Sequence, residues 1–311
     1  MRVVLTGAGG MLGSSIVRSW ARQRPGDELV PFTRERVDLC DAAATAAALA
    51  EERPDAVIHA AARVAGIADK LAGPDRFLAE NLRIDDAVIS GAVAADVPEL
   101  LYVSSGAIYP ADAEQPIRED AALTGSLEPA NESYALAKIV GGRRCAYLSA
   151  QHGYAYRVAI PSNLYGPGDD FSAGRAHLVP AAIAKAHAAV VDGSSSIEVW
   201  GDGTARREFT YAGDLADWLV TQIGGLAGWP AALNLGAGAD HTVREYYELA
   251  AEVTGFTGDL VFDSTKPSGV ARRLLDSSAA AALGWTAPTP LPAGYAESYA
   301  QYLASERKAS R

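Results

Sequence analysis

The stretch VVLTGAGGMLGSSIVRSW, residues 3 to 20, decides the fold of this chain. Its first four residues are an apolar run that predicts a buried strand. Gly7, Gly10 and Gly13 follow at Gly-x-x-Gly-x-x-Gly spacing and open a helix. Such glycines allow a tight turn, close approach of the backbone to a pyrophosphate, and close packing of the helix, whose N-terminus then faces the phosphates. The stretch therefore predicts a strand–turn–helix unit that binds a dinucleotide.

Strand-like and helical segments alternate over the first half of the chain, which predicts parallel βαβ units. We expect an α/β fold with a Rossmann-type doubly wound parallel sheet over residues 1–165. After about residue 165 the chain is richer in turns, and we expect residues 166–311 to form a smaller C-terminal α/β lobe, with some segments returning to the first domain. The expected strands are 3–6, 28–32, 55–60, 99–104 and 154–160, and the expected helices are 10–24, 41–53, 75–95, 133–152, 242–254 and 292–307.

Composition excludes several classes of function. The 27 Lys and Arg residues against 38 Asp and Glu residues give a net charge of −11, which opposes binding to nucleic acid or to an anionic membrane surface. Only Cys40 and Cys145 are present, and Met1 leads almost directly into a strand, so we expect a cytoplasmic protein without a signal peptide or disulfides. The five histidines show no metal-ligand spacing with the cysteines, and we expect no metal.

The end of the second expected strand bears on the choice of cofactor. An NAD site usually has Asp or Glu there to hold the ribose hydroxyls, whereas this chain has Arg34 and Arg36. A cation suits a 2′-phosphate, so NADP(H) is favoured; the alternative is that both arginines are solvated surface charges, and NAD(H) stays open. The expected cofactor-binding residues are Gly7, Gly10, Met11, Leu12, Gly13, Arg34, Asp38, Leu39, Ala61 and Lys138.

Two further segments suggest carbonyl chemistry. In NESYALAK, residues 131–138, Tyr134 and Lys138 are four apart on one helix face, and the strand before that helix ends in Ser104 and Ser105. A carbonyl that receives a hydride also needs a proton, and a phenol can supply it if a nearby ammonium stabilises the phenolate. Ser105 can hydrogen-bond the same carbonyl. The alternative is a tyrosine and a lysine that merely lie on an amphipathic helix.

Eight further motifs follow in sequence order: VAGI (64–67), SGAIYP (105–110), LEPANESYALAKI (127–139), PSNLYGPGDDF (161–171), AHLVPA (176–181), VWGDGTARREF (199–209), DLAD (214–217) and KPSGVARRLLD (266–276). With these motifs the chain resembles the GDP-L-fucose synthase family of extended short-chain dehydrogenase/reductases, from about residue 3 to residue 303. The resemblance implies that the C4 ketone of a nucleotide sugar makes C3 and C5 acidic, that a base and an acid invert both centres, and that NADPH then reduces C4.

The resemblance carries site residues and partners with it. It implies that Ser105, Tyr134 and Lys138 form the reductive triad and that His177 is the epimerisation acid, although His177 could instead only hydrogen-bond a sugar hydroxyl. It also implies a nucleotide-sugar substrate, with GDP favoured and dTDP possible, bound mainly by the second lobe, and a homodimer. The expected substrate-binding residues are Ser105, Asn163, His177, Trp200, Arg207 and Lys266.

The chain departs from the family at the epimerisation base, where the family has a cysteine and this sequence has Ala107. Alanine can neither accept nor donate a proton. Cys145 is seven residues beyond Lys138 and fits a buried structural thiol better than a substitute base. We therefore expect a C4 ketoreductase of a nucleoside-diphosphate 4-keto-6-deoxyhexose that lacks 3,5-epimerase activity. The alternatives are a complete GDP-L-fucose synthase in which another group replaces the cysteine, and a non-catalytic cofactor sensor.

Overall fold

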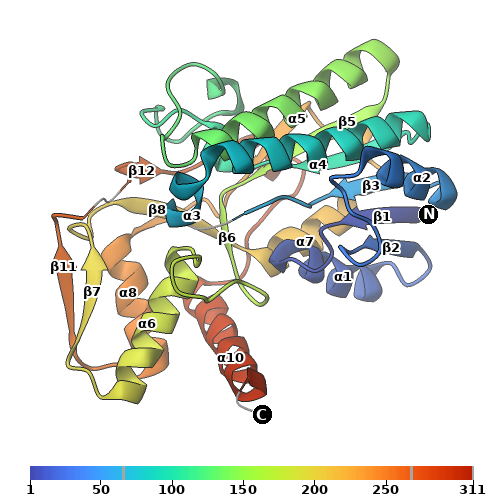
Figure 1. The fold of residues 1–311 in the computed structure, drawn as a ribbon. Helices are drawn as coiled ribbons and strands as arrows, with labels where there is room; N and C mark the ends of the chain where they lie inside the picture. Colours follow the sequence, from blue (N-terminus) through green and yellow to red (C-terminus); the bar gives the residue numbers. More distant parts are fainter. Residues whose placement is uncertain (65–66, 267–268, 310–311) are drawn as a thin grey trace.

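A computed structural model describes residues 1–64, 67–266 and 269–309 of the chain (Figure 1). Its centre is a six-stranded parallel sheet of order β2-β1-β3-β4-β5-β9. The chain runs outward from β1 to β2 and then continues on the other side of β1. This reversal confirms the predicted Rossmann-type doubly wound α/β fold, in which ligands bind beyond the carboxyl ends of the strands. The strands are β1 (Arg2–Thr6), β2 (Glu28–Phe32), β3 (Ala56–His59), β4 (Glu99–Val103), β5 (Ala155–Pro161) and β9 (Ala232–Leu235).

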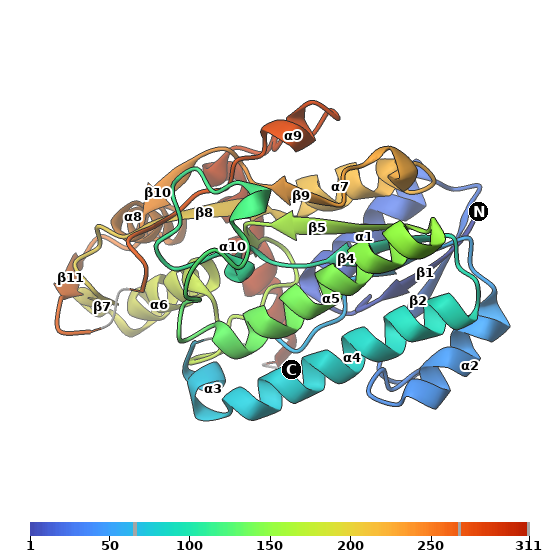
Figure 2. The same cartoon turned by 90° about the horizontal axis from the view of Figure 1, so that it is seen from above.

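Helices cover both faces of this sheet, as the view from above shows (Figure 2). Helices α1 and α7 pack against each other on one face, and α2, α4 and α5 pack side by side on the other. Helix α4 begins with Pro74, whose missing N–H costs no hydrogen bond at that position. The helices are α1 (Met11–Gln23), α2 (Ala42–Glu52), α4 (Pro74–Ala94), α5 (Glu132–His152) and α7 (Ala212–Gln222).

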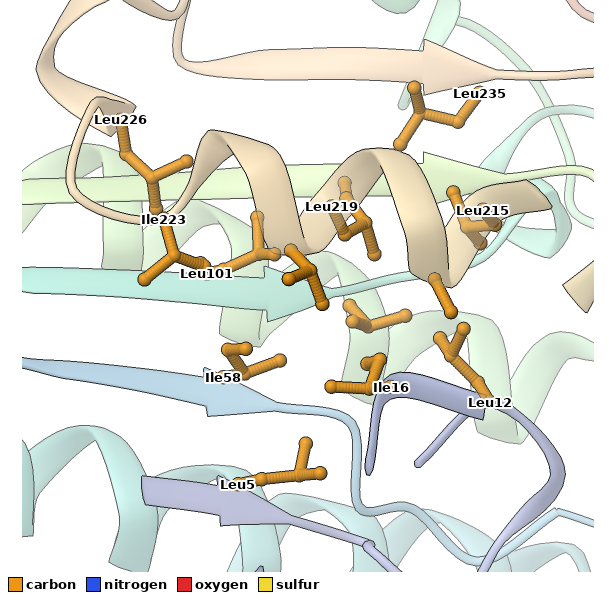
Figure 3. Close-up of a cluster of buried hydrophobic side chains, with 14 of the residues drawn as sticks. Leu5, Leu12, Ile16, Ile58, Leu101, Leu215, Leu219, Ile223, Leu226 and Leu235 are labelled. Atoms are coloured by element: carbon orange, nitrogen blue, oxygen red, sulfur yellow. The ribbon is translucent and has the colours of Figure 1, made fainter. Parts of the chain in front are cut away.

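An apolar cluster joins the sheet to α1 and α7 (Figure 3). Leu5 of β1, Ile58 of β3 and Leu101 of β4 point to this face and meet Ile16 of α1 and Leu219 of α7. All five side chains are fully buried. Each contributes about 1.5–3 kcal/mol of hydrophobic stabilisation, so this cluster fixes the position of the turn that joins β1 to α1.

The alternate residues of the same strands point to the opposite face. Val4, Val57 and Leu100 pack there with Val88 of α4 and Cys145 of α5. Cys145 is fully buried, as expected of a structural thiol, and burial raises the pKa of its thiol to about 12. A thiol in this position stays protonated and does not transfer protons near neutral pH.

A smaller α/β region lies beside the central sheet and surrounds its own apolar cluster (Figure 1). Strand β8 pairs with β6, β10 and β12, and β7 pairs with β11. A capping box is present at the start of the helix that follows β10, because the side chain of Thr242 and that of Glu245 each bond the other's backbone N–H. The elements are β6 (Asn163–Tyr165), α6 (Leu178–Asp192), β7 (Ser196–Trp200), β8 (Arg206–Tyr211), β10 (Asp240–Thr242), α8 (Val243–Thr254), β11 (Asp259–Asp263), β12 (Arg272–Arg273) and α10 (Leu291–Ala309).

Two elements that follow β8 in the sequence belong to the central sheet. Strand β9 pairs with β5, with Val158 opposite Ala232 and Pro161 opposite Leu235, and α7 packs on α1. The two regions are therefore interleaved along the chain. Short elements complete the described fold: α3 (Ile67–Ala72), η1 (Gly106–Ile108), η2 (Glu119–Ala121), η3 (Leu226–Gly228) and α9 (Ser278–Ala281).

None of the helices within the described part of the chain combines the length and the apolar composition that a bilayer span requires. Two of the motifs quoted above include residues 65–66 and 267–268, which lie outside the described residues.

Candidate active site

The glycine turn between β1 and α1 has the shape needed to hold a pyrophosphate. Gly7 has φ +74°, and a Cβ built on it would lie 2.7 Å from the backbone nitrogen of Ala61, in the segment after β3. A Cβ on Gly13 would lie 2.0 Å from the carbonyl oxygen of Gly7. Gly10 is the N-cap of α1 and brings no capping side chain, so the helix N-terminus is left to an anion. The turn fits a dinucleotide cofactor.

The residues expected at the cofactor's ribose lie in the turn after β2. Arg34 is exposed there. Arg36 forms an ion pair with Glu52, and its guanidinium lies 5.1 Å from the centroid of the Phe32 ring. Arg36 is therefore held by the protein, and Arg34 is the better placed of the two to meet a phosphate. The other cofactor candidates in this area are Met11 and Leu12 in the first turn of α1 and Asp38 and Leu39 after β2.

Ser105 and Tyr134 come together at the carboxyl end of β4. Ser105 caps η1, where its Oγ accepts a hydrogen bond of 3.2 Å from the N–H of Ala107. Tyr134 is buried in the first turn of α5. Burial and the charge of Asp85 raise the pKa of Tyr134, while a hydrogen bond with Ser105 lowers it by less. The phenol is therefore protonated at neutral pH and can donate a proton to a carbonyl oxygen held by both hydroxyls.

Lys138 lies one turn along α5 from Tyr134 and is almost fully buried. The sequence predicts that the Lys138 ammonium stabilises the phenolate of Tyr134. In the structure, Nζ of Lys138 lies 3.4 Å from Oδ1 of Asp85 on α4 and 4.6 Å from the centroid of the Tyr102 ring. Burial opposes ionisation of Asp85. The charge of Lys138 and the hydrogen bonds from His59 and Tyr102 together outweigh burial and lower the pKa of the Asp85 carboxyl. Lys138 is thus one half of a buried ion pair.

The ion pair continues as a hydrogen-bonded chain to the glycine turn. The hydroxyl of Tyr102 donates to Oδ2 of Asp85 at 2.6 Å, and Nε2 of His59 lies 3.0 Å from Oδ1. Nδ1 of His59 lies 2.7 Å from Oγ1 of Thr6, the last residue of β1, and Thr6 accepts from the N–H of Ala61 at 3.3 Å. Burial lowers the pKa of His59, so its ring is neutral; Thr6 then donates to Nδ1 and Nε2 donates to Asp85. Sequence reasoning missed Asp85 and His59.

A further residue that the sequence analysis missed lies beside Tyr134. Lys70 of α3 is 5% exposed; its Nζ donates a hydrogen bond of 2.8 Å to Oδ1 of Asn131 and lies 5.3 Å from the centroid of the Tyr134 ring. His177, the half-buried N-cap of α6, is close enough for the charge of Lys70 to affect its pKa. Burial first and Lys70 second lower the pKa of His177 to about 4. His177 is therefore neutral at pH 7 and suits hydrogen bonding better than proton donation.

Arg207 on β8 is linked to the residues around Lys70 by Glu128, which interacts electrostatically with Arg207 and accepts a hydrogen bond from Asn131. Burial lowers the pKa of Arg207, and Glu128 opposes this effect. Glu128 also accepts from Nδ2 of Asn131 at 2.8 Å and lies 3.9 Å from Nη2 of Arg273. Arg273 in turn donates to the carbonyl oxygen of Gly106 at 2.6 Å, which braces the turn that carries Ser105. Sequence reasoning missed Glu128 and Arg273.

The other substrate candidates lie on the second region. Lys266 is exposed, and its Nζ lies 5.9 Å from the centroid of the Trp200 ring at the end of β7. Trp200 is 57% exposed, which leaves a large aromatic face for stacking on a flat ligand. Asn163 is exposed at the start of β6, opposite Phe209 of β8. Within residues 1–64, 67–266 and 269–309, no group of three or more His, Cys, Asp or Glu side chains is arranged to hold a metal ion.

The fold and this constellation of serine, tyrosine and lysine beside a glycine turn define a nucleotide-dependent oxidoreductase of the short-chain dehydrogenase/reductase type. The chain belongs to the NAD dependent epimerase/dehydratase family, whose family model matches residues 3–236. It is 37% identical to the GDP-L-colitose synthase of Yersinia pseudotuberculosis over 99% of each chain. It is 40% identical to a GDP-L-fucose synthase of Sinorhizobium fredii, over 98% of this chain and 96% of that one.

A solved structure extends these similarities. The GDP-mannoheptose C4 reductase from Campylobacter jejuni with NADP bound superimposes with a TM-score of 0.87 at 28% identity, over 97% of this chain and 98% of that one. The similarity spans both regions of the fold. The family resemblance drawn from the sequence motifs is confirmed.

Proposed function

We propose that this protein reduces the C4 ketone of a GDP-linked 4-keto-6-deoxyhexose with NADPH and does not invert C3 or C5. The observation that carries the first half is the pairing of Ser105, at the end of β4, with the buried Tyr134, which lies one helical turn from Lys138. Residues 1–165 hold most of the cofactor site, and residues 166–311 mainly hold the nucleotide sugar. The names of the related GDP-sugar synthases and of the GDP-mannoheptose C4 reductase support the substrate class.

The glycine turn and the N-terminus of α1 would hold the cofactor's pyrophosphate, and Arg34 would meet the 2′-phosphate. When bound, the cofactor supplies the hydride. The NADP in the related C4 reductase supports the choice of NADP(H). Gly9, which follows Ala8 in the turn, has open space where a side chain would be, so the backbone of this turn is accessible to a ligand.

The chain's own residues supply the proton and the polarisation. Ser105 and Tyr134 hydrogen-bond the C4 oxygen and hold the ketone in place. Tyr134, protonated because its pKa is raised by burial, transfers its proton to that oxygen as negative charge develops on it. Lys138 is fixed by Asp85 and brings positive charge to the helix turn next to the resulting phenolate.

The second half of the proposal rests on Ala107. Its backbone N–H bonds Ser105, so its position beside the catalytic serine matches the place of the family's basic cysteine, but its methyl group cannot move a proton. His177 would be the partner acid, and its pKa of about 4 leaves almost no imidazolium at pH 7. Both features support a reductase that does not invert C3 and C5.

The test is to incubate the pure protein with GDP-4-keto-6-deoxy-D-mannose in D2O, with and without NADPH, and to follow C3, C4 and C5 by NMR. We expect NADPH oxidation and reduction at C4, with no deuterium at C3 or C5. The matched variant Ala107→Cys restores a thiol beside Ser105 and is expected to introduce exchange at C3 or C5. No NADPH oxidation by the wild type would refute the proposed reductase.

A complete epimerase/reductase is the second candidate, because the relatives at 38–41% identity include several named GDP-L-fucose synthase. Deuterium at C3 and C5 in the wild type would establish it. That result would show that a group other than residue 107 removes the proton.

A further inference from the structure

We propose that Lys70 is a specificity-determining residue whose ammonium donates a hydrogen bond to the 3-hydroxyl of the bound 4-keto sugar, so that the site prefers substrates that carry this hydroxyl. The inference rests on the proposed function, because it takes the ketone to lie on Ser105 and Tyr134. It names a feature of the substrate that the reductase chemistry alone does not require.

The first observation is the place of Lys70. Its Nζ lies 5.3 Å from the centroid of the Tyr134 ring, on α3, which no other catalytic candidate shares. His177 of α6 is close enough for the two charges to interact. Tyr134, His177 and Lys70 thus come from three elements and lie close together, so a ketone that accepts the proton of Tyr134 lies near Lys70.

The second observation is that the ammonium needs further acceptors. A lysine ammonium has three N–H donors, and burying them without partners is costly. Within the described residues, the hydrogen bond of Lys70 is to Oδ1 of Asn131 at 2.8 Å, and Glu128 interacts with it only through its charge. Burial lowers the pKa of Lys70 to about 8, which shows that these neighbours do not fully compensate the buried charge. A ligand oxygen would supply a missing acceptor.

The third step identifies that oxygen. In a 6-deoxy-4-ketohexose, C5 carries a methyl group and the ring oxygen, whereas C3 carries a hydroxyl next to the carbonyl. The diphosphate is attached at C1, across the ring from C4. Of the two carbons that flank the C4 ketone, only C3 carries a hydroxyl, so a hydrogen bond from Lys70 to a hydroxyl next to the ketone is a bond to the 3-hydroxyl. Lys70 donates to Asn131, which itself donates to Glu128, so contacts within the protein position the ammonium in the free enzyme.

The experiment compares two ketones that differ only at C3: GDP-4-keto-6-deoxy-D-mannose and the same compound without the 3-hydroxyl. The ratio of their kcat/KM values is measured by NADPH oxidation for the wild type, Lys70→Met and Lys70→Gln. A charged hydrogen bond of this kind predicts a wild-type preference of about 10- to 100-fold for the 3-hydroxy substrate. Lys70→Met is expected to bring the ratio close to one, and Lys70→Gln to give an intermediate ratio.

The matched control is Lys185→Met. Lys185 also donates to a carbonyl oxygen, that of Glu198 at 3.0 Å, and also lies over a tyrosine ring, that of Tyr247 at 5.9 Å, but it is an exposed residue of α6. This variant is expected to keep the wild-type ratio.

Three outcomes would overturn the inference. A wild-type ratio near one would do so without any variant, so the test survives a variant that fails to fold. An equal loss with both ketones in Lys70→Met would show that Lys70 acts on the diphosphate or on the fold. Failure of the wild type to reduce either ketone would refute the proposed function, and the inference with it.

Discussion

Replacing Lys70 with methionine is expected to stabilise the free protein at pH 7 by about 2 kcal/mol. Burial lowers the pKa of Lys70 from 10.5 to about 8, and this gap corresponds to about 3 kcal/mol of native-state stability lost at neutral pH. Loss of the hydrogen bond to Asn131 costs the variant about 1 kcal/mol, so the net gain in stability is smaller than the gain from removing the buried charge. Methionine keeps the apolar stem of the side chain, so the packing around α3 is retained.

The sign of the pH dependence follows from the direction of the pKa change. Because the pKa is lower in the folded state, the unfolded chain holds more protons between pH 8 and 10.5, and wild-type stability rises through that window. The difference in free energy of unfolding between Lys70→Met and the wild type is therefore constant below about pH 7 and shrinks towards zero near pH 9.5. His177 and Tyr134, which face Lys70, keep one protonation state between those two pH values, since His177 titrates at about 4 and the pKa of Tyr134 is raised.

The assay is urea unfolding of the wild type and of Lys70→Met at pH 7 and at pH 9.5, followed by tryptophan fluorescence. Lys185→Met is the control, and because Lys185 is less buried we expect a smaller gain of the same sign. A variant no more stable than the wild type at pH 7 would refute the reasoning. A gain that is equal at both pH values would trace the effect to packing instead of charge.

Three other changes test the rest of the site. Tyr134→Phe removes the proton donor and should lower kcat at least about 100-fold with NADPH affinity unchanged in a fluorescence titration; a normal kcat would contradict the assignment. Asp85→Asn leaves the Lys138 ammonium buried without its carboxylate and should cost about 3–5 kcal/mol in urea unfolding, whereas a loss below about 1 kcal/mol would argue against a tight ion pair. Gly13→Ala puts a Cβ 2.0 Å from the Gly7 carbonyl oxygen and should weaken NADPH binding more than about 10-fold, while Gly26→Ala, with open space around it, should not; similar affinities would show that the turn adapts.

Local sequence patterns predicted part of the candidate site. The spacing of Gly7, Gly10 and Gly13 and the pair Tyr134 and Lys138 are determined within one turn or one helix, so the sequence shows them directly. The alternation of strands and helices was predicted for the same reason.

The missed residues depend on packing between distant segments. Asp85 is 53 residues from Lys138, and the two meet only because α4 and α5 pack side by side. A signal was present: Phe77, Asn81, Asp85 and Val88 follow one buried face of α4, and a carboxylate on such a face needs a partner. Lys70 carried no such signal, because α3 is a six-residue helix too short to show a periodic pattern.

Strand β9 also bears on the order in which the protein can be made. β5 is complete at Pro161, but the strand that covers its outer edge ends at Leu235, so more than seventy residues are synthesised before that edge is paired. During this interval a growing chain on the ribosome exposes an open strand that can pair with a neighbouring nascent chain. The central sheet can close only late in translation, and a ribosome-bound chain that stops before Leu235 should be a preferred target for chaperones.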